Sequence, residues 1–129
     1  MTDADAASQR RSGCPITATL ELIGDKWSLI VIRDLLVGKR RFNEFMSSPE
    51  RITTNILADR LSRLEQTGLV TRTSYSEHPP RFEYALTEKG RALHPLLQEI
   101  CRWGNRFIAD TWTPPASFMA DTAADSGSH

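Results

Sequence analysis

The stretch ITTNILADRLSRLEQTGLV, residues 52–70, contains the signals of one complete amphipathic helix. Thr53 is a suitable N-cap, because its hydroxyl can accept a hydrogen bond from a backbone N–H group of the first turn. Gly68 supplies the left-handed residue that commonly ends a helix. Apolar residues recur between these ends at helical spacing and form one stripe: Leu57, Leu61 and Leu64. The stretch therefore predicts a helix with one buried face.

The face opposite the leucines carries short or hydrogen-bonding side chains. It consists of Asn55, Ala58, Asp59, Ser62 and Gln66, with Arg63 at its edge. A solvated face would more often be filled with Glu and Lys. This face resembles the recognition helix of a helix-turn-helix, whose N-terminal residues reach base edges in the major groove. An ordinary half-buried helix is the alternative, and this stretch alone does not choose between them.

Downstream of this helix the hydrophobic period changes from helical to alternating. Residues 69–75 (LVTRTSY) are rich in β-branched and aromatic side chains, and apolar and polar residues alternate again over residues 82–86 (FEYAL). The intervening residues 76–81 (SEHPPR) contain two prolines and suit the tip of a hairpin. A helix followed at once by such a hairpin is the arrangement of a helix and its wing. We therefore predict a mainly α fold with a small β-hairpin wing, a winged helix-turn-helix.

Three further helices are expected before residue 52. Pro15 suits the first turn of a helix that Gly24 closes, and Asp25 can cap the next helix. From Lys26 to Val37 the sequence is apolar nearly all round, which indicates a central helix packed on several sides. A short third helix is expected from an apolar cluster at helical spacing, Phe42, Phe45 and Met46.

The last expected helix begins after Thr87 and runs to about Trp112, with a kink at Pro95. It carries more large apolar side chains than a small winged domain can bury. We expect part of this stripe to face a second copy of the chain: Leu93, Leu97, Ile100, Trp103 and Phe107. A two-fold homodimer would present two recognition helices to a pseudo-palindromic DNA site.

Length and composition bound the possible classes of protein. We expect one domain, residues 14–112, between disordered tails at residues 1–13 and 113–129. No apolar run approaches the roughly 20 residues of a membrane span, and the first residues lack an apolar signal segment, so we expect a cytoplasmic protein with no membrane partner. The formal net charge is 0, but residues 14–109 hold 14 Lys and Arg against 11 Asp and Glu. This mildly basic segment weakly supports a nucleic-acid partner.

Several motifs occur in an order that is similar to that of a known family. They are Gly-Asp-Lys-Trp at 24–27, Arg-Phe-Asn-Glu at 41–44, Leu-Xaa-Xaa-Arg-Leu at 57–61 and Glu-Tyr-Xaa-Leu-Thr at 83–87. They resemble the HxlR-type family of bacterial winged helix-turn-helix regulators, and the match covers nearly all of Cys14 to Phe107. The turn SSPER, residues 47–51, is more charged than the glycine-containing turn of many members.

The resemblance has two implications beyond the fold. It implies a homodimeric transcription factor whose first and last helices form the dimer, which adds Ile16 and Leu20 to the expected interface. It also implies a cysteine just before the first helix, which senses oxidants or electrophiles in some members.

Candidate contacts to double-stranded DNA lie first on the predicted recognition helix. We expect six residues there to approach the major groove: Thr53, Thr54, Asn55, Asp59, Ser62 and Arg63. Asn55 can pair with adenine, Arg63 with guanine or phosphate, and Asp59 can accept from cytosine or orient an arginine. For each of them the alternative is a solvated side chain.

Two more groups of cations are candidates for phosphate contacts. Lys39, Arg40 and Arg41 lie near the start of the short helix, where the macrodipole favours an anion. The alternative is a solvated basic turn. Arg81, at the end of the wing, can enter the minor groove or touch phosphate, or it can pair with a carboxylate across the hairpin.

The two cysteines receive different predictions. Cys14 directly precedes a helix N-terminus and lies near Arg10 and Arg11, and both features favour thiolate over thiol. We therefore consider it a candidate redox or electrophile switch whose modification shifts the dimer-forming helices. The alternative is a small apolar residue at the domain edge. Cys101, on the long apolar helix, is expected in the core.

The chain shows no zinc-ligand spacing, catalytic triad or glycine-rich phosphate loop, so we expect no enzyme activity, no metal and no cofactor. The expected partners are double-stranded DNA, a second copy of the chain, and an oxidant or small-molecule effector. A winged module that binds another protein without DNA is the main rival.

Overall fold

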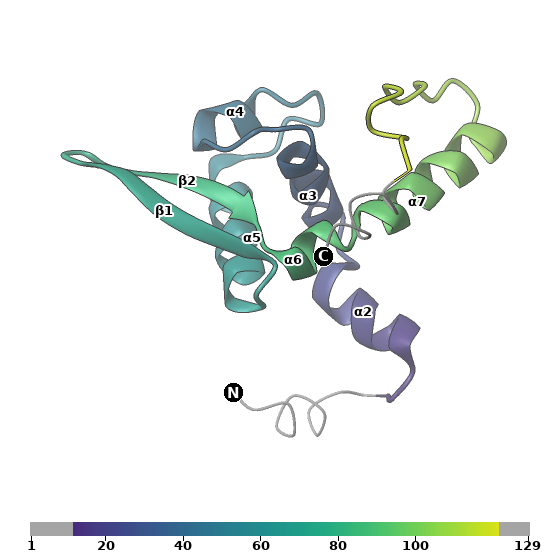
Figure 1. The fold of residues 1–129 in the computed structure, drawn as a ribbon, viewed down its shortest axis with the longest axis horizontal. Coiled ribbons are helices and arrows are strands. Elements are labelled where there is room, and N and C mark those ends of the chain that lie inside the picture. Colours follow the sequence, from purple (N-terminus) through teal and green to yellow (C-terminus); the bar gives the residue numbers. More distant parts are fainter. Residues whose placement is uncertain (1–11, 122–129) are drawn as a thin grey trace.

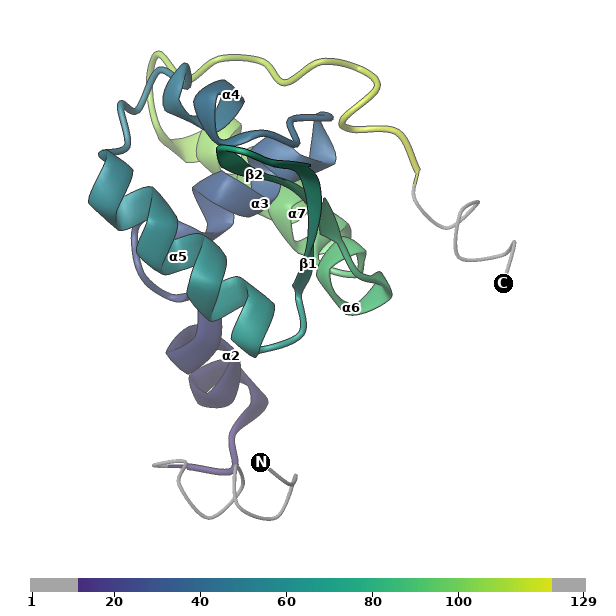
Figure 2. The same ribbon diagram turned by 90° about the vertical axis from the view of Figure 1, so that its left-hand side faces the viewer.

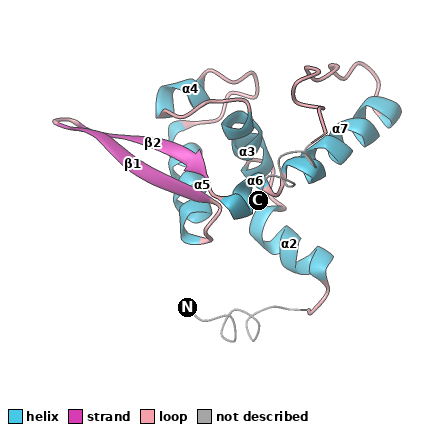
Figure 3. Cartoon of the chain, viewed as in Figure 1, coloured by secondary structure: helices cyan, strands magenta, loops and turns pink. Residues whose placement is uncertain are grey.

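The computed structural model describes residues 12–121. In these residues six helices and one hairpin follow one another in the order expected for a winged helix-turn-helix (Figure 1). The elements are α2 (Pro15–Ile23), α3 (Ser28–Leu36), α4 (Phe42–Met46), α5 (Thr54–Gln66), β1 (Val70–Glu77), β2 (Pro80–Leu86), α6 (Glu88–Arg91) and α7 (His94–Phe107). Figure 3 shows that the two strands form the only sheet of this described segment.

Helix α3 lies at the centre of the fold and contacts α5, β2 and α7. Its side chains Val31 and Ile32 are almost fully buried, as the nearly continuous apolar run predicted. Asp25 accepts hydrogen bonds from the backbone N–H groups of Trp27 and Ser28, which confirms its capping role. The core around α3 comprises Ile23, Val31, Ile32, Leu35, Phe45, Ile52, Leu57, Leu61, Leu64, Leu69, Val70, Leu97 and Phe118.

Helix α5 has the ends and the buried face that its sequence predicted. The Thr53 hydroxyl accepts a hydrogen bond from the N–H group of Ile56 at 3.4 Å. Gly68 follows the C-cap with a φ of 81°, a conformation that costs glycine little. The three leucines of the stripe are each at most 1% exposed, so α5 is fixed to the core along one side.

The hairpin is longer than predicted, and its turn is correspondingly tighter. Strand pairing runs from Val70↔Leu86 to Glu77↔Pro80, with an irregularity between Ser74 and Ser76. A loop over residues 76–81 was expected because of its prolines. Pro80 nevertheless starts a strand at the edge of a two-stranded sheet, where its missing N–H group is tolerated.

The last helical region consists of two helices rather than one kinked helix. Helix α6 ends at Arg91, and α7 starts at His94 with Pro95 in its first turn. A proline has no N–H group to donate, so it fits a first turn better than a helix interior. Helix α7 also ends at Phe107, earlier than the predicted end near Trp112.

Residues 109–121, which we call the C-terminal strap, turn back along α7 (Figure 1). His94 Nε2 donates to the Phe118 carbonyl at 2.8 Å, and Gln98 Nε2 donates to the carbonyls of Phe118 and Ala120 at 3.0 and 2.7 Å. The Phe118 side chain is 7% exposed. The expected disordered tail therefore differs from the structure over residues 113–121, because Phe118 completes the core; residues 1–11 and 122–129 lie outside the described residues.

The elements divide the molecule into two sides. Figure 2 faces the side that carries α5 and the hairpin, and α7 lies behind them. Helix α2 projects from the body of the domain. Along residues 12–121, none of the helices combines the length and the apolar character needed to cross a membrane.

Candidate nucleic-acid interface

The outward face of α5 is free of contacts with the rest of the domain over most of its length. Thr54, Asn55, Ala58, Asp59 and Ser62 are all exposed, while the leucines on the opposite face are buried. This follows from the helical period, because residues half a turn away from a buried stripe must face outward. The structure thus presents the polar N-terminal half of α5 as a ridge.

Charges on this ridge are linked to the body of the domain. Arg60 Nε donates to Asp25 Oδ2 at 2.7 Å, and its other end pairs with Asp59. Asp59 also lies 3.7 Å from Arg63. Of the two roles expected for Asp59, the geometry matches the orientation of an arginine.

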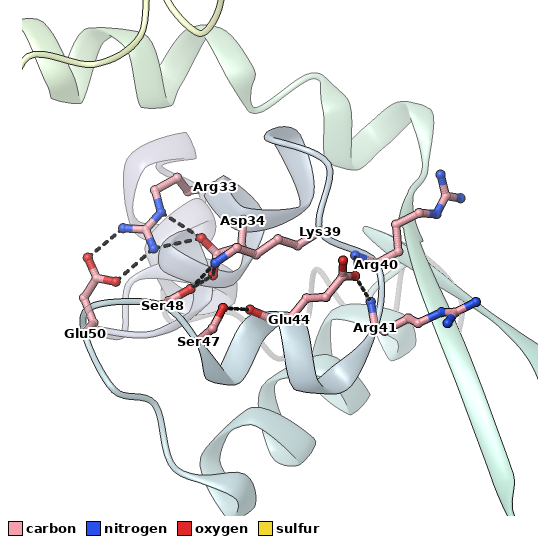
Figure 4. Close-up of polar contacts among 9 residues, drawn as sticks. All are labelled: Arg33, Asp34, Lys39, Arg40, Arg41, Glu44, Ser47, Ser48 and Glu50. Carbon is pink, nitrogen blue, oxygen red and sulfur yellow. Dashed lines mark hydrogen bonds and ion pairs between the residues drawn. The ribbon is translucent and has the colours of Figure 1, made fainter.

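Lys39 does not have the free ammonium group expected of a phosphate ligand. Its Nζ donates to Ser48 Oγ at 2.7 Å and lies 3.7 Å from Asp34 Oδ2 (Figure 4). Asp34 and Ser48 are 3% and 4% exposed. A cation is needed there because a buried carboxylate without a partner is costly. The structure therefore places Lys39 in an internal network rather than in a basic surface patch.

The N-terminus of α4 is also occupied. Glu44 Oε1 accepts hydrogen bonds from the N–H groups of Arg40 and Arg41 at 2.9 and 2.8 Å. These hydrogen bonds lower the pKa of Glu44 below its ordinary value. The expected anion site at this helix start is therefore filled by the chain's own carboxylate.

The two arginines beside Lys39, Arg40 and Arg41, differ in whether their side chains have a partner. Arg41 pairs with Glu83 through Nε at 2.9 Å, which raises the pKa of Arg41, and its guanidinium lies 4.0 Å from the ring of Tyr75. Arg41 thus ties the wing to the start of α4. Arg40 is exposed, and among residues 12–121 its side chain has no ion-pair partner. In Figure 4 both guanidinium groups point away from the Asp34 network.

A second part of this network holds the turn before α5. Arg33 forms a two-pronged pair with Glu50, at 2.7 and 2.9 Å, and also donates to Asp34 (Figure 4). The pairing with Arg33 lowers the pKa of Glu50. Glu50 lies in the turn that precedes α5, so the network connects the end of α3 to the start of the predicted recognition helix.

Arg51 is a candidate cation that the sequence analysis did not include. It adopts a φ of 58°, in the left-handed region that side chains other than glycine rarely adopt. Its side chain is exposed, and no partner for it exists within the described part of the chain. The signal was present in the charged turn SSPER, but the sequence did not show which of its side chains point outward.

Arg81 lies on β2 close to the tip of the hairpin. It is exposed, and in the segment 12–121 it forms no ion pair with a carboxylate. The cross-strand pair that was the alternative for this residue is therefore absent from that segment. Arg72, on β1, lies over the ring of Phe82 at 4.2 Å and 3.7 Å from Glu65.

Cys14 is the exposed N-cap residue of α2. Interaction with the backbone N–H groups of Thr17 and Ile16 lowers the pKa of the Cys14 thiol below its ordinary value. This agrees with the expectation from its position at a helix start. Arg10 and Arg11, the nearby charges in that argument, lie outside the described residues. Cys101 is half-buried against the core.

Apolar side chains on α2 and α7 remain exposed. On α7 they form one stripe: Leu96, Ile100, Trp103 and Phe107, of which the last two are each 61% exposed. Ile16 and Leu20 on α2 are 70% and 58% exposed. Leu97 differs from the expectation, because it is 6% exposed within its own core, and Leu93 packs against that core. The stripe on α7 that is available to a partner therefore includes Leu96 in place of Leu93 and Leu97.

No group of three or more potential metal ligands exists among residues 12–121.

A central helix, a second helix with an exposed polar face, and a hairpin beside it define the winged helix-turn-helix class of proteins. The chain belongs to the HxlR-like helix-turn-helix family, whose sequence profile matches residues 22–111. The fold and family predicted from the sequence are therefore confirmed.

Known relatives and solved structures agree with this assignment. The chain is similar to the HTH-type transcriptional regulator YdeP of Bacillus subtilis (strain 168), with 41% identity over 103 residues that cover 80% of each chain. It is also similar to the redox regulator HypR in its oxidized form, with a TM-score of 0.65 and 42% identity over 72% of this chain and 96% of that chain. The reduced form of the regulator YodB from B. subtilis gives a TM-score of 0.63 and 34% identity over 78% and 100%. These proteins are transcriptional regulators, and the expectation that the chain is not an enzyme is confirmed by its family.

Proposed function

We propose that the protein is a homodimeric, sequence-specific regulator that binds double-stranded DNA. Helix α5 enters the major groove, where Asn55, Ser62 and Arg63 meet base edges, and Thr53 and Thr54 lie near the flanking phosphate. Arg40, Arg51 and Arg81 contact phosphates on either side. The observation that carries the proposal is the exposed polar N-terminal half of α5 beside a wing with an unpaired arginine.

The dimer in this proposal is formed through the exposed apolar residues of α2 and α7. Their exposure in a single chain supports an interface, because monomeric proteins rarely expose contiguous apolar patches of this kind. Helix α7, which carries the stripe, lies on the far side of the domain from the hairpin and behind α5 (Figures 1 and 2). A two-fold dimer then leaves both recognition helices available for a pseudo-palindromic operator.

Cys14 is the proposed control point for an oxidant or electrophile. Its thiolate attacks one oxygen of hydrogen peroxide, so that an S–O bond forms, the O–O bond breaks and the other oxygen leaves as hydroxide. The resulting sulfenic acid condenses with another thiol to a disulfide with release of water. Either change occurs at the start of α2, so it alters the packing of a dimer-forming helix. The similarity to the redox regulator HypR and the lowered pKa of Cys14 support this part of the proposal.

The test begins with selection of bound duplexes from fragments of the source genome, followed by anisotropy titrations on the selected sequence. Asn55→Ala should cost about 1–3 kcal/mol of specific binding and relax the base preference at one position in each half-site. Glu99→Ala is the control, since it removes an exposed polar side chain from α7, outside the proposed DNA-binding surface.

Two outcomes would contradict the proposal. A wild-type protein that selects no duplex and shows no salt-dependent binding would point to the rival module that binds protein without DNA. An Asn55→Ala variant with unchanged affinity and base preference would remove Asn55 from the set of base contacts.

A further inference from the structure

A groove of about 440 Å³ lies between α3, α7 and the C-terminal strap. Apolar side chains from all three segments line it, including Leu29 of α3, Ile100 of α7, and Trp112 and Pro115 of the strap. Sites for small molecules in proteins have volumes of about 300–1,000 Å³ and mostly apolar walls. The groove has the size and the lining of such a site.

The charged residues of the groove are already neutralised by one another. Arg33 pairs with Glu50 and Asp34, and Lys39 bonds Ser48 and lies beside Asp34 (Figure 4). An anionic ligand would therefore find no free cation there, and a cationic ligand would find no free carboxylate. Only an uncharged ligand leaves this network intact.

The strap wall is held by directed contacts rather than by apolar packing alone. Asn105 Nδ2 donates to the Trp112 carbonyl at 2.9 Å, and Gln98, which is 5% exposed, donates to two strap carbonyls. The strap beyond residue 111 lies outside the segment that matches the family. The wall is thus formed by residues that follow the segment matched by the family profile.

We propose that this groove binds a small, uncharged aromatic molecule. Trp112 is 76% exposed and lines the groove, so its indole provides a flat surface against which an aromatic ring can stack. Proline rings and aliphatic side chains cover the remaining faces. The Cys101 thiol lies in the wall and reports on occupancy.

We also infer that a ligand bound in the groove changes DNA affinity, and this step rests on the proposed function. Lys39 and Pro49 border both the groove and the turn that precedes α5. Arg33 joins the groove to the same turn through Glu50. Suppose that this network has two arrangements and that a ligand binds one of them more tightly. The ligand then shifts the position of α5, and the change in DNA affinity is limited by the ligand's difference in affinity between the two arrangements.

The groove is distinct from the surface proposed for the dimer. Leu96, Trp103 and Phe107 belong to the exposed stripe of α7 and do not line the groove, which meets that stripe only at Ile100. A second copy can therefore cover the stripe while the groove stays accessible to a small molecule.

The experiment uses the full chain and two fluorescent probes that differ by one charge. N-phenylnaphthylamine is uncharged, and anilinonaphthalene sulfonate carries a sulfonate on a closely similar skeleton. We expect the uncharged probe to bind at least about tenfold more tightly, and Trp112→Ala to weaken it about tenfold. Trp103→Ala, which removes the same side chain from the α7 stripe, should leave its binding unchanged. In the Cys14→Ser protein, where Cys101 is the remaining cysteine, the probe should slow alkylation of Cys101.

The readouts separate the possible failures. Equal binding of the two probes, or loss of binding in Trp103→Ala but not in Trp112→Ala, would overturn the site. A change of oligomeric state in Trp112→Ala, seen by sedimentation, would assign the groove to a second copy instead. Probe binding is measured without DNA, so the test of the groove remains valid even if the protein binds no duplex.

The coupling is tested by the effect of the probe on DNA affinity. We expect a change of at least about fivefold in the wild type and none in Glu50→Gln, which still binds the probe but lacks the Arg33 ion pair. An unchanged DNA affinity in the wild type, with the probe bound, would overturn the coupling and leave the binding site.

Discussion

Single side chains in this protein acquire their roles from partners that are distant in sequence. Lys39, Arg40 and Arg41 are adjacent, yet Lys39 joins a buried network, Arg41 pairs with Glu83 of the wing, and Arg40 faces outward. One basic run thus contains two structural cations and one that is available to a ligand. The cations that we propose as DNA contacts are therefore Arg40, Arg51 in the turn before α5, and Arg81 on the wing.

Arg81 is a proposed phosphate contact on the wing, and no carboxylate in the described segment pairs with it. Arg81→Ala should weaken binding to all duplexes alike and lower the slope of log affinity against log salt by about one. Titrations at several salt concentrations measure this slope. Arg102→Ala, which removes an arginine paired with Glu99 on α7, should leave the slope unchanged; an equal effect of the two variants would contradict the assignment.

The Cys14 thiol should ionise at a lower pH than an ordinary cysteine. Two backbone N–H groups at the start of α2 stabilise the thiolate, so its pKa is lowered. In the Cys101→Ser protein, the rate of alkylation against pH should have its midpoint below the roughly 8.5 of a free thiol. A midpoint at that value, together with an oxidant response that persists in Cys14→Ser, would exclude the switch.

At the scale of elements, ion pairs fix the angle between α5 and the body of the domain. Arg60 of α5 bonds Asp25, which also caps the start of α3, and Arg33 of α3 bonds Glu50 in the turn before α5. The first contact holds the middle of α5 to the start of α3, and the second holds the turn before α5 to the last turn of α3. The leucine stripe fixes the distance between α5 and the core, and these ion pairs fix the direction of the helix axis.

The Asp25 carboxylate should make folding stability sensitive to acid. Partial burial raises its pKa, but hydrogen bonds from Ser28, Arg60 and the Trp27 N–H group outweigh this and hold the pKa far below its ordinary value. A lowered pKa stabilises the fold at pH values above about 4, and this contribution is lost as the pH falls below that value toward the folded pKa.

Asp25→Asn tests this linkage because asparagine preserves the cap and removes only the charge. The variant should lose about 1–2 kcal/mol of unfolding free energy near neutral pH and show a shallower decline in acid, measured by urea unfolding at a series of pH values. Glu21→Gln, the same change on the exposed face of α2, is the control. Equal pH profiles for wild type and Asp25→Asn would contradict the linkage.

At the scale of the whole molecule, the two sides of the domain serve different contacts. Helix α5 and the hairpin occupy one side, and helix α7, which carries the exposed apolar stripe, lies behind them (Figure 2). The strap covers a third region of α7 through Gln98 and Phe118. One helix thus contributes to the core, to the groove and to the proposed dimer.

The dimer can be tested by placing a charge in the centre of the stripe. Trp103→Glu should produce a monomer at concentrations where the wild type is a dimer, because an unpaired carboxylate in an apolar interface is costly. Operator affinity should fall as well, since the two half-sites are then bound independently. Sedimentation velocity measures the first effect and anisotropy the second. Arg102→Glu, on the polar face of α7, should stay dimeric; a monomeric wild type would contradict the proposal.

Local signals in the sequence determined the helices, the wing and the exposed face of α5, because capping, turn residues and hydrophobic period act over a few residues. They also pointed to Cys14 as a helix N-cap. They failed where tertiary packing decides: Pro95 starts α7 instead of kinking it, Leu97 lies in the core, and Phe118 draws the strap onto the domain.

Tertiary structure alone decided which charges are available to a partner. Arg41 finds Glu83 across 42 positions, Arg60 finds Asp25 across 35, and Gln98 finds Ala120 across 22. No pattern of neighbouring residues encodes such pairings, because they depend on how the elements meet in space. The sequence therefore determined the recognition face, and the packing determined the cations beside it and the groove behind it.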